Sequence, residues 1–233
     1  MDKNIKCLVL FGSHARGDHD LHSDIDLLGI DNSYDYGVTS IKTTNLSLYS
    51  EEKLTEMMAQ GDLFALHLKE EGICIFNDEI FNVIKKSFKY KDDYSSEIYT
   101  SYLLAKKILE REAEIKDWAF ANRRISWCIR TFLISLSAEK RTPFFSKKAM
   151  STFANDISNK TINKLSFEDQ YFLIDAKAHS SKNEKILTLL SIFLHCFSEF
   201  DDENKITKRV FYSSGVVCNT LESLFHDLKN YYE

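Results

Sequence analysis

The sequence is nearly free of proline: Pro143 is the only one among 233 residues. Because proline interrupts helices, its scarcity favours a chain that is mostly helical with few rigid loops. No apolar run approaches the roughly 20 residues that a membrane-spanning helix requires. Met1 to Asn4 lead directly into a predicted strand, so we expect no signal peptide and a cytoplasmic location.

Cysteine and positive charge are also limited. The five cysteines are odd in number, widely spaced and mostly set among apolar residues: Cys7, Cys74, Cys128, Cys196 and Cys218. This pattern fits neither a disulfide framework nor a zinc site, so we expect reduced thiols. The net charge of −5 argues against non-specific coating of nucleic acid, although it leaves room for a local basic groove. The length and the 44% apolar content fit one large or two small globular domains.

The most informative stretch begins at Cys7. From there to Phe11 the chain is continuously apolar, as expected of a strand buried on both faces. Gly12 and Ser13 interrupt the run, and a polar loop with Arg16 follows. Glycine and serine at the end of a strand allow backbone N–H groups to approach a phosphate closely. This part therefore predicts a phosphate-binding turn.

The next part of the stretch, Ser23 to Leu28, alternates carboxylates with aliphatic side chains. Alternation at period two places Asp24 and Asp26 on one face of a strand. Two neighbouring carboxylates repel each other unless a cation lies between them. A hard divalent ion such as Mg²⁺ prefers oxygen ligands and keeps waters and substrate phosphates in its other positions. The pattern therefore predicts a site for a nucleoside triphosphate (NTP) and a metal.

Together the two parts resemble a family signature. Gly-Ser-x-Ala-Arg-Gly, a short loop and Ser-Asp-x-Asp-Leu are typical of the DNA polymerase beta-type nucleotidyltransferases, particularly the minimal and the antibiotic nucleotidyltransferases. The signature lies here at residues 12–17 and 23–27, and the resemblance covers about the first third of the chain. Taken singly, the pieces would be interpreted as a solvated strand edge, an ordinary turn and a surface arginine. Their order and spacing favour the functional interpretation.

The resemblance implies an α+β N-terminal domain, a small mixed sheet with helices, that transfers a nucleoside monophosphate from an NTP. Asp24 and Asp26 would be the catalytic residues and would hold Mg²⁺, with ATP the expected nucleotide. The residues that would bind the nucleotide are Gly12, Ser13, Arg16 and Ser23.

The third strand of the resembled family usually carries another carboxylate, which helps to hold the metal or deprotonates the attacking hydroxyl. Here residues 31–43 are polar and predict a loop, and the alternation over 45–49 predicts the third strand. Its polar face offers only Asn45 and Ser47. This departure puts the second-metal site and the general base in question.

Two loop acids, Asp31 and Asp35, are near enough in sequence to replace that carboxylate, although solvated loop acids are the plainer interpretation. His14, His19 and His22 stand among aspartates and raise the alternative of a transition-metal site. Their spacing fits no ligand template, and hard carboxylates already account for the acids.

Helices are predicted after the third strand. Ser50 is a good N-cap for a helix that ends near Gly61, and a second helix continues as far as Gly72. His67 lies within this second helix, where we expect a packed or hydrogen-bonded histidine. Residues 73–76 predict a short buried strand.

The pattern becomes purely helical afterwards. An amphipathic helix covers 80–88, and the charged segment 89–95 is the best boundary between a nucleotidyltransferase domain (1–90) and an α-helical acceptor- or partner-binding domain (91–233). Period 3.6 predicts further helices at 95–121, 123–139, 147–158, 167–180, 184–200 and 215–231.

The predicted helical domain contains a basic stretch. Between Asn122 and Met150 there are seven basic residues and one acid. Arg123 and Arg130 lie seven residues apart and therefore share a helix face. Such a face suits a triphosphate tail or a polyanionic acceptor such as RNA, while solvated charges on an amphipathic helix are the alternative.

Three functions compete. The favoured one is transfer to a macromolecular acceptor, either a partner protein's side chain or a tRNA 3′ end, as in toxin–antitoxin and phage-defence nucleotidyltransferases. Transfer to an aminoglycoside-like small molecule is second, because a polycationic drug needs an acidic pocket and residues 122–150 are basic. The third is a degenerate protein that binds nucleotide or a partner without turnover. No membrane partner is expected, and an oligomer is compatible with all three.

Overall fold

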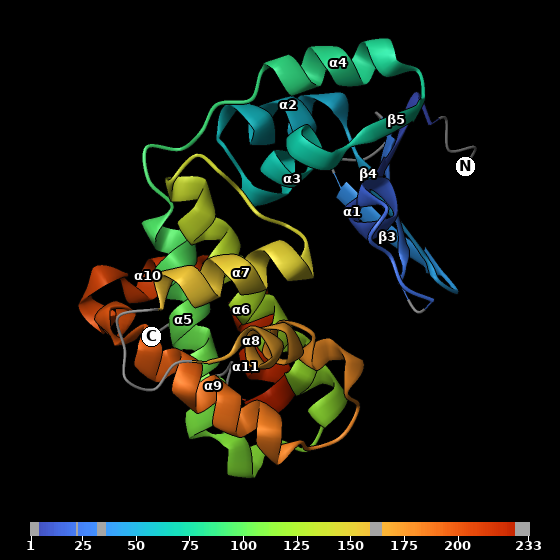
Figure 1. Cartoon of the computed structure of the whole chain (residues 1–233). Coiled ribbons are helices and arrows are strands. Elements are labelled where there is room, and N and C mark those ends of the chain that lie inside the picture. The colour runs from blue at the N-terminus through green and yellow to red at the C-terminus, as the bar shows by residue number, and fades with distance from the viewer. Residues whose placement is uncertain (1–4, 22, 32–35, 159–164, 227–233) are drawn as a thin grey trace. The chain divides into compact units, whose positions relative to one another are not determined.

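The computed structural model describes residues 5–21, 23–31, 36–158 and 165–226. The chain divides into two compact units, Met1–Asp92 and Asp93–Glu233, which are described separately below. The first contains a five-stranded sheet with helices, and the second is mostly helical (Figure 1). The predicted fold class is therefore confirmed.

The sheet of the first unit is mixed, with strand order β3-β4-β2-β1-β5. Its strands are β1 (Cys7–Phe11), β2 (Ile25–Ile30), β3 (Tyr36–Ile41), β4 (Thr44–Tyr49) and β5 (Ile73–Phe76). Strand β2 is central and pairs antiparallel with β1 and parallel with β4. Both edges of β2 are thus fixed by backbone hydrogen bonds.

One face of the sheet packs against helices α2 (Glu51–Ala59), α3 (Leu63–Glu71) and α4 (Asp78–Lys86) (Figure 1). The strand residues in this core alternate along the chain, as period two requires. They pack against apolar residues of the three helices, and the cluster comprises Cys7, Val9, Phe11, Leu28, Ile30, Leu54, Met58, Ala65, Leu68, Phe81 and Ile84.

Side-chain caps start helices α2 and α3, and the first of these caps, Ser50, is the one that the sequence predicts. The Ser50 hydroxyl accepts a hydrogen bond from the Lys53 amide at 3.1 Å. The Asp62 carboxylate accepts one from the Phe64 amide at 2.8 Å. Each cap satisfies an amide that has no partner within the first turn of its helix.

Two predictions for the sheet are wrong. The predicted loop over 31–43 contains strand β3, which pairs with β4 through a tight turn at Lys42, where φ is 55°. The predicted buried strand is β5, which lies at an edge of the sheet and leaves Ile73, Ile75 and Phe76 more than half exposed. A short apolar run does not reveal whether its strand is central or at an edge.

The second unit contains α5 (Ser95–Glu110), α6 (Trp118–Glu139), α7 (Lys147–Ile157), α8 (Phe167–Ile174), α9 (Glu184–Cys196), α10 (Lys208–Ser213) and α11 (Gly215–Phe225). They enclose a single large apolar cluster that includes Phe132 and Phe193. Helices therefore form most of this unit, as predicted.

The predicted helix boundaries need correction in several places, among them the helix predicted over 184–200, which is α9 and ends at Cys196. The helix expected over 95–121 is broken between α5 and α6, where a short 3-10 turn (Glu112–Glu114) precedes the N-cap Asp117. The fourth predicted helix ends at Ile174 rather than near 180. Helix α10 was not predicted, and the end of the last predicted helix falls outside the described residues.

The described cysteines are free thiols. Cys7 and Cys74 are neighbours, with their sulfur atoms 3.7 Å apart. Burial, followed by the hydrogen bond with Cys74, raises the pKa of the Cys7 thiol to about 12, so this thiol stays protonated. In the described part of the chain, no helix has the length and apolar character that crossing a membrane requires.

Gly61 offers a sharp test of the first unit's packing. Its φ is 66°, and a Cβ there would lie 2.5 Å from the Lys89 carbonyl oxygen. Gly17, with a φ of 75°, has no atom within 4 Å of such a Cβ. We expect Gly17→Ala to lower the free energy of unfolding by about 1 kcal/mol through backbone strain alone. Gly61→Ala should lower the free energy of unfolding by at least twice as much, because the added Cβ also meets the Lys89 carbonyl. Urea denaturation measures both losses, and equal losses would contradict this close packing at Gly61.

Candidate functional site

A tight turn connects the end of β1 to the short helix α1 (Gly12–Arg16). Gly12 begins this helix with a φ of 75°, a conformation that favours glycine. Gly17 ends it in the left-handed conformation, and its amide donates to the Ser13 carbonyl. Ser13 itself is half-buried, and its hydroxyl has no hydrogen-bond partner among the described residues. The predicted turn is thus present at the end of a buried strand, and phosphate binding there stays a prediction.

Asp26 lies directly beside this turn. In the register of the sheet, Asp26 is opposite Phe11 on one side and Asn45 on the other. A Cβ placed on Gly12 would lie 2.9 Å from the Asp26 Oδ2 atom. Glycine is therefore required at position 12 by the backbone conformation and also by the close approach of the Asp26 carboxylate.

Asp24 immediately precedes strand β2 and is exposed. Within the described residues its carboxylate has neither an ion pair nor a hydrogen bond, whereas Asp26 is half-buried. Alternation along the strand directs the two side chains to the same face. They are hard oxygen donors of the kind that Mg²⁺ prefers.

Asn45 occupies the strand position where the family resemblance predicts a third carboxylate. Its Nδ2 atom donates a hydrogen bond to Asp26 Oδ1 at 3.2 Å, and its Oδ1 atom accepts one from the Ser40 hydroxyl at 2.8 Å. Ser47 is opposite Leu28, two residues further along the strand than the Asp26–Asn45 pair. The neighbour of Asp26 on β4 is therefore a neutral amide.

The loop acids do not replace the missing carboxylate. Asp31 follows the opposite end of β2, five residues from Asp26 along an extended strand, which corresponds to roughly 16 Å. Asp35 and His22 lie outside the described residues. Within the described part, no three His, Cys, Asp or Glu side chains come together as a metal-binding group.

Arg16 is held by carboxylates of the protein. Its Nη1 atom lies 2.5 Å from Glu71 Oε2, at the end of α3, and its Nε atom lies 3.1 Å from Asp18 Oδ1. The His67 Nε2 atom lies 2.6 Å from the same Glu71 oxygen, and the His67 ring packs edge-on against Phe11. The prediction of a packed and hydrogen-bonded histidine is confirmed. This network ties the phosphate-binding turn to α3, a connection that the sequence did not reveal.

The loop between α1 and β2 has its own hydrogen bonds. The Ser23 hydroxyl accepts from the Asp20 amide at 2.9 Å and donates to the Asp20 carboxylate at 3.1 Å. The His14 ring stacks on His19, and its Nε2 atom lies 3.3 Å from the Ser23 carbonyl oxygen. Ser23 and the two histidines therefore hold this loop together, and a role for Ser23 in nucleotide binding stays a prediction.

The predicted basic face lies on α6 in the second unit. Arg123 is exposed, with its guanidinium 5.8 Å from the centre of the Phe120 ring. Arg130 is half-buried and donates to the Phe145 carbonyl at 3.4 Å. Arg124, between them, donates to Asn219, and burial lowers its pKa. Arg123 is therefore the arginine of this face with the greatest exposure to an anionic ligand, whereas Arg130 also has a structural contact.

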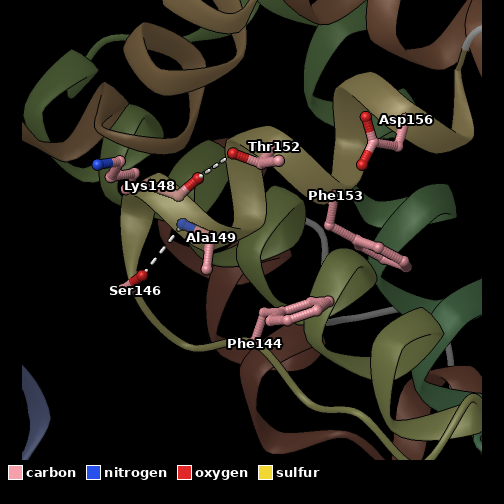
Figure 2. A pocket seen from close by; sticks show the side chains of 7 residues that line it. All are labelled: Phe144, Ser146, Lys148, Ala149, Thr152, Phe153 and Asp156. Atoms are coloured by element: carbon pink, nitrogen blue, oxygen red, sulfur yellow. Dashed lines mark hydrogen bonds between the residues drawn. The ribbon is translucent and has the colours of Figure 1, made fainter.

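A surface pocket of about 350 Å³ lies over α7 (Figure 2). Two aromatic rings form its floor, those of Phe144 and Phe153, with centres 5.3 Å apart. One lysine and one aspartate, Lys148 and Asp156, stand at its edge. The pocket thus has neither the basic cluster that a polyanion needs nor the acidic cluster that an aminoglycoside needs.

The comparison with family models bears on the first unit. The model described as "Polymerase beta, Nucleotidyltransferase" matches residues 1–81. This unit is a nucleotidyltransferase domain of the polymerase beta type. The matched segment contains Gly12, Asp26 and Asn45, so the geometry above is that of the domain's central region.

Among solved structures, a nucleotidyltransferase-like protein from Exiguobacterium sibiricum 255-15 is similar to this chain. The similarity has a TM-score of 0.38 and 14% sequence identity, and it covers 97% of this chain and 84% of that protein. No curated protein matches the chain.

The Arg16–Glu71 ion pair of the nucleotidyltransferase domain predicts a stability difference. The Glu71 side chain is 9% exposed, whereas Glu56, which pairs with Lys53, is 49% exposed. We expect Glu71→Ala to lower the free energy of unfolding by about 2 kcal/mol, because it leaves Arg16 short of a partner. Glu56→Ala should cost less than about 1 kcal/mol. Urea denaturation measures the free energy of unfolding of each variant. Similar losses in the two variants would show that the Arg16–Glu71 pair stabilises the domain no more than an exposed ion pair does.

Proposed function

We propose that this protein is a Mg²⁺-dependent nucleotidyltransferase that moves a nucleoside monophosphate from an NTP, with ATP as the expected donor, to a hydroxyl of a macromolecular acceptor. The observation that supports it is the position of Asp26 on the central strand, against the Gly12 turn. A carboxylate and a glycine turn this close together support binding of a cation and a triphosphate side by side. The polymerase beta match over residues 1–81 supports the same reaction class.

The residues present fit a divalent cation. Asp24 is exposed with no protein partner among the described residues, and Asp26 Oδ2 faces the turn. Bound there with the triphosphate, Mg²⁺ would neutralise phosphate charge and orient the attacking hydroxyl. The protein's own part is positioning: the backbone at Gly12 and the Ser13 hydroxyl bind the β- and γ-phosphates. In-line phosphoryl chemistry depends chiefly on such positioning and on charge neutralisation.

We assign Arg16 an indirect part in this site. Its guanidinium already pairs with Asp18 and Glu71, so a phosphate would have to share it with two carboxylates. Arg16 therefore acts first by holding the turn against α3. A direct contact with the triphosphate would be additional.

For the acceptor, we favour a macromolecule over an aminoglycoside-like molecule. The exposed Arg123 and the basic composition of residues 122–150 suit a polyanionic or protein partner better than a polycation. A partner protein's side chain and a tRNA 3′ end both remain within this proposal. A role in a toxin–antitoxin or phage-defence module is proposed on the resemblance to minimal nucleotidyltransferases alone.

A degenerate, non-catalytic nucleotide-binding protein is the second candidate. The observation that favours it is Asn45, a neutral amide beside Asp26. The two candidates separate in one experiment: the protein is incubated with each labelled NTP, Mg²⁺, total tRNA and cell lysate. Label on an acceptor supports the enzyme, and nucleotide binding without any transfer supports the degenerate protein.

The proposed cation ligands give a direct prediction. Asp24→Asn and Asp26→Asn keep side-chain volume and remove charge, so each should lower label transfer by more than about a hundredfold through lost charge stabilisation. Asp156→Asn, on α7 in the other unit, is the control and should leave transfer unchanged. Full transfer by both site variants would exclude this metal site.

The basic face gives a second prediction. Arg123→Glu should weaken binding of the acceptor or of the triphosphate by roughly tenfold, the effect of one lost charge-assisted contact. Arg209→Glu, an exposed arginine on α10, is the matched control. Because Arg130 also donates to the Phe145 carbonyl, its reversal would mix binding with folding. An affinity that Arg123→Glu leaves unchanged would identify Arg123 as a solvated charge.

A further inference from the structure

The two oxygens of Asp26 have different surroundings. Oδ1 accepts the hydrogen bond from the Asn45 amide, and Oδ2 faces the Gly12 turn. A cation and an N–H donor cannot approach the same lone pair of a carboxylate oxygen. The amide therefore blocks the β4 side of the carboxylate and leaves the side of the Gly12 turn open to a positive ion.

The direction of the Asn45 amide is itself fixed. The Asp26 carboxylate only accepts hydrogen bonds, so the amide nitrogen faces it, and the amide oxygen on the other side accepts from the Ser40 hydroxyl on β3. Strands β3, β4 and β2 hold the three residues side by side, because Ser40 is opposite Asn45 and Asn45 is opposite Asp26 in the strand register. An amide turned the other way would place its oxygen against the Asp26 carboxylate, which is repulsive.

We propose that Asn45 is a positioning residue that restricts this site to a single divalent cation, bound on the Gly12 side of Asp26. Two-cation sites hold their ions about 3.5–4 Å apart and share an oxygen ligand set between them. Here the second position would lie on the side of Asn45, whose oxygen is already used by Ser40 and whose nitrogen carries only donors. The inference rests on the proposed function, because it assumes that Asp24 and Asp26 bind a cation.

A single cation has a consequence for the chemistry. With a neutral amide at position 45, that side of Asp26 has no carboxylate to take a proton from the acceptor hydroxyl and no second cation to make that hydroxyl more acidic. Other described acids close to the turn, Asp18 and Glu71, are occupied by Arg16. We therefore expect the acceptor to lose its proton to a group other than residue 45, such as water or the triphosphate.

The test is a titration of the purified full chain with Mn²⁺ alone. The electron paramagnetic resonance signal of the free ion measures how much Mn²⁺ remains unbound. The wild-type protein should bind one Mn²⁺ per chain, and Asp26→Asn should abolish this binding. Asn45→Ala should still bind one ion but about tenfold more weakly, as expected when a residue that orients a metal ligand is removed. Ser40→Ala should weaken binding less. Asn82→Ala removes an exposed asparagine that bonds to Asp78 and is the control.

Asn45→Asp is the decisive variant. It places two carboxylates directly opposite each other on neighbouring strands, so it should lower the melting temperature in the absence of cations. Mn²⁺ should restore that temperature, and the stoichiometry should rise from one ion to two. These readouts need no acceptor and no catalytic activity. Thermal melting of each variant also reports whether it is folded.

The outcomes separate the inference from the proposed function. Wild-type protein that binds no Mn²⁺, or binds it equally well without Asp26, overturns both. Binding that depends on Asp26 but is unchanged in Asn45→Ala overturns the positioning role alone. Two ions on the wild-type protein, or one ion on a folded Asn45→Asp variant, overturns the restriction to a single cation.

Discussion

The pairing of the central strand β2 on both edges is the constraint on which the site depends. Backbone hydrogen bonds place Phe11, Asp26 and Asn45 in one row across three strands. The chain leaves this row at Gly12, where a left-handed backbone conformation turns it away from the sheet and brings it against the Asp26 carboxylate. Burial of the strand residues against α2, α3 and α4 fixes the register, because a shift by one residue would turn Asp26 to the other face.

Local sequence patterns predicted the elements that build this row. The apolar run that became β1, the alternation that became β2 and β4, and the cap Ser50 are local signals, and each lies where it was expected. Strand β3 was missed because its residues resemble a loop, and pairing with β4 makes them a strand. The break between α5 and α6 was missed because apolar spacing continues through Ile115, while the new helix depends on the cap at Asp117.

The sequence predicted only those residues of the candidate site that lie close together along the chain. Gly12, Ser13, Asp24 and Asp26 lie within one short motif. The tie between Arg16 and Glu71 joins residues 55 positions apart, and Asn45 is 19 positions from Asp26. The absence of an acid at position 45 was visible in the sequence. The strand register was needed to show that the Asn45 amide donates to Asp26 and accepts from Ser40.

These contacts describe a nucleotidyltransferase domain whose charges are arranged around one carboxylate. Arg16 is neutralised by Asp18 and Glu71, and Asn45 contributes a dipole rather than a charge. We therefore expect a bound cation to supply positive charge for the triphosphate. The second unit, with the exposed Arg123 on α6, is where we expect the acceptor to be chosen.

The most direct test of the central claim is an anomalous diffraction map of crystals grown with Mn²⁺ and a non-hydrolysable ATP analogue. Our account predicts one manganese peak in contact with Asp24 and with Oδ2 of Asp26, and a triphosphate against Gly12 and Ser13. A manganese peak that does not touch these carboxylates, or a triphosphate bound away from the Gly12 turn, would contradict it.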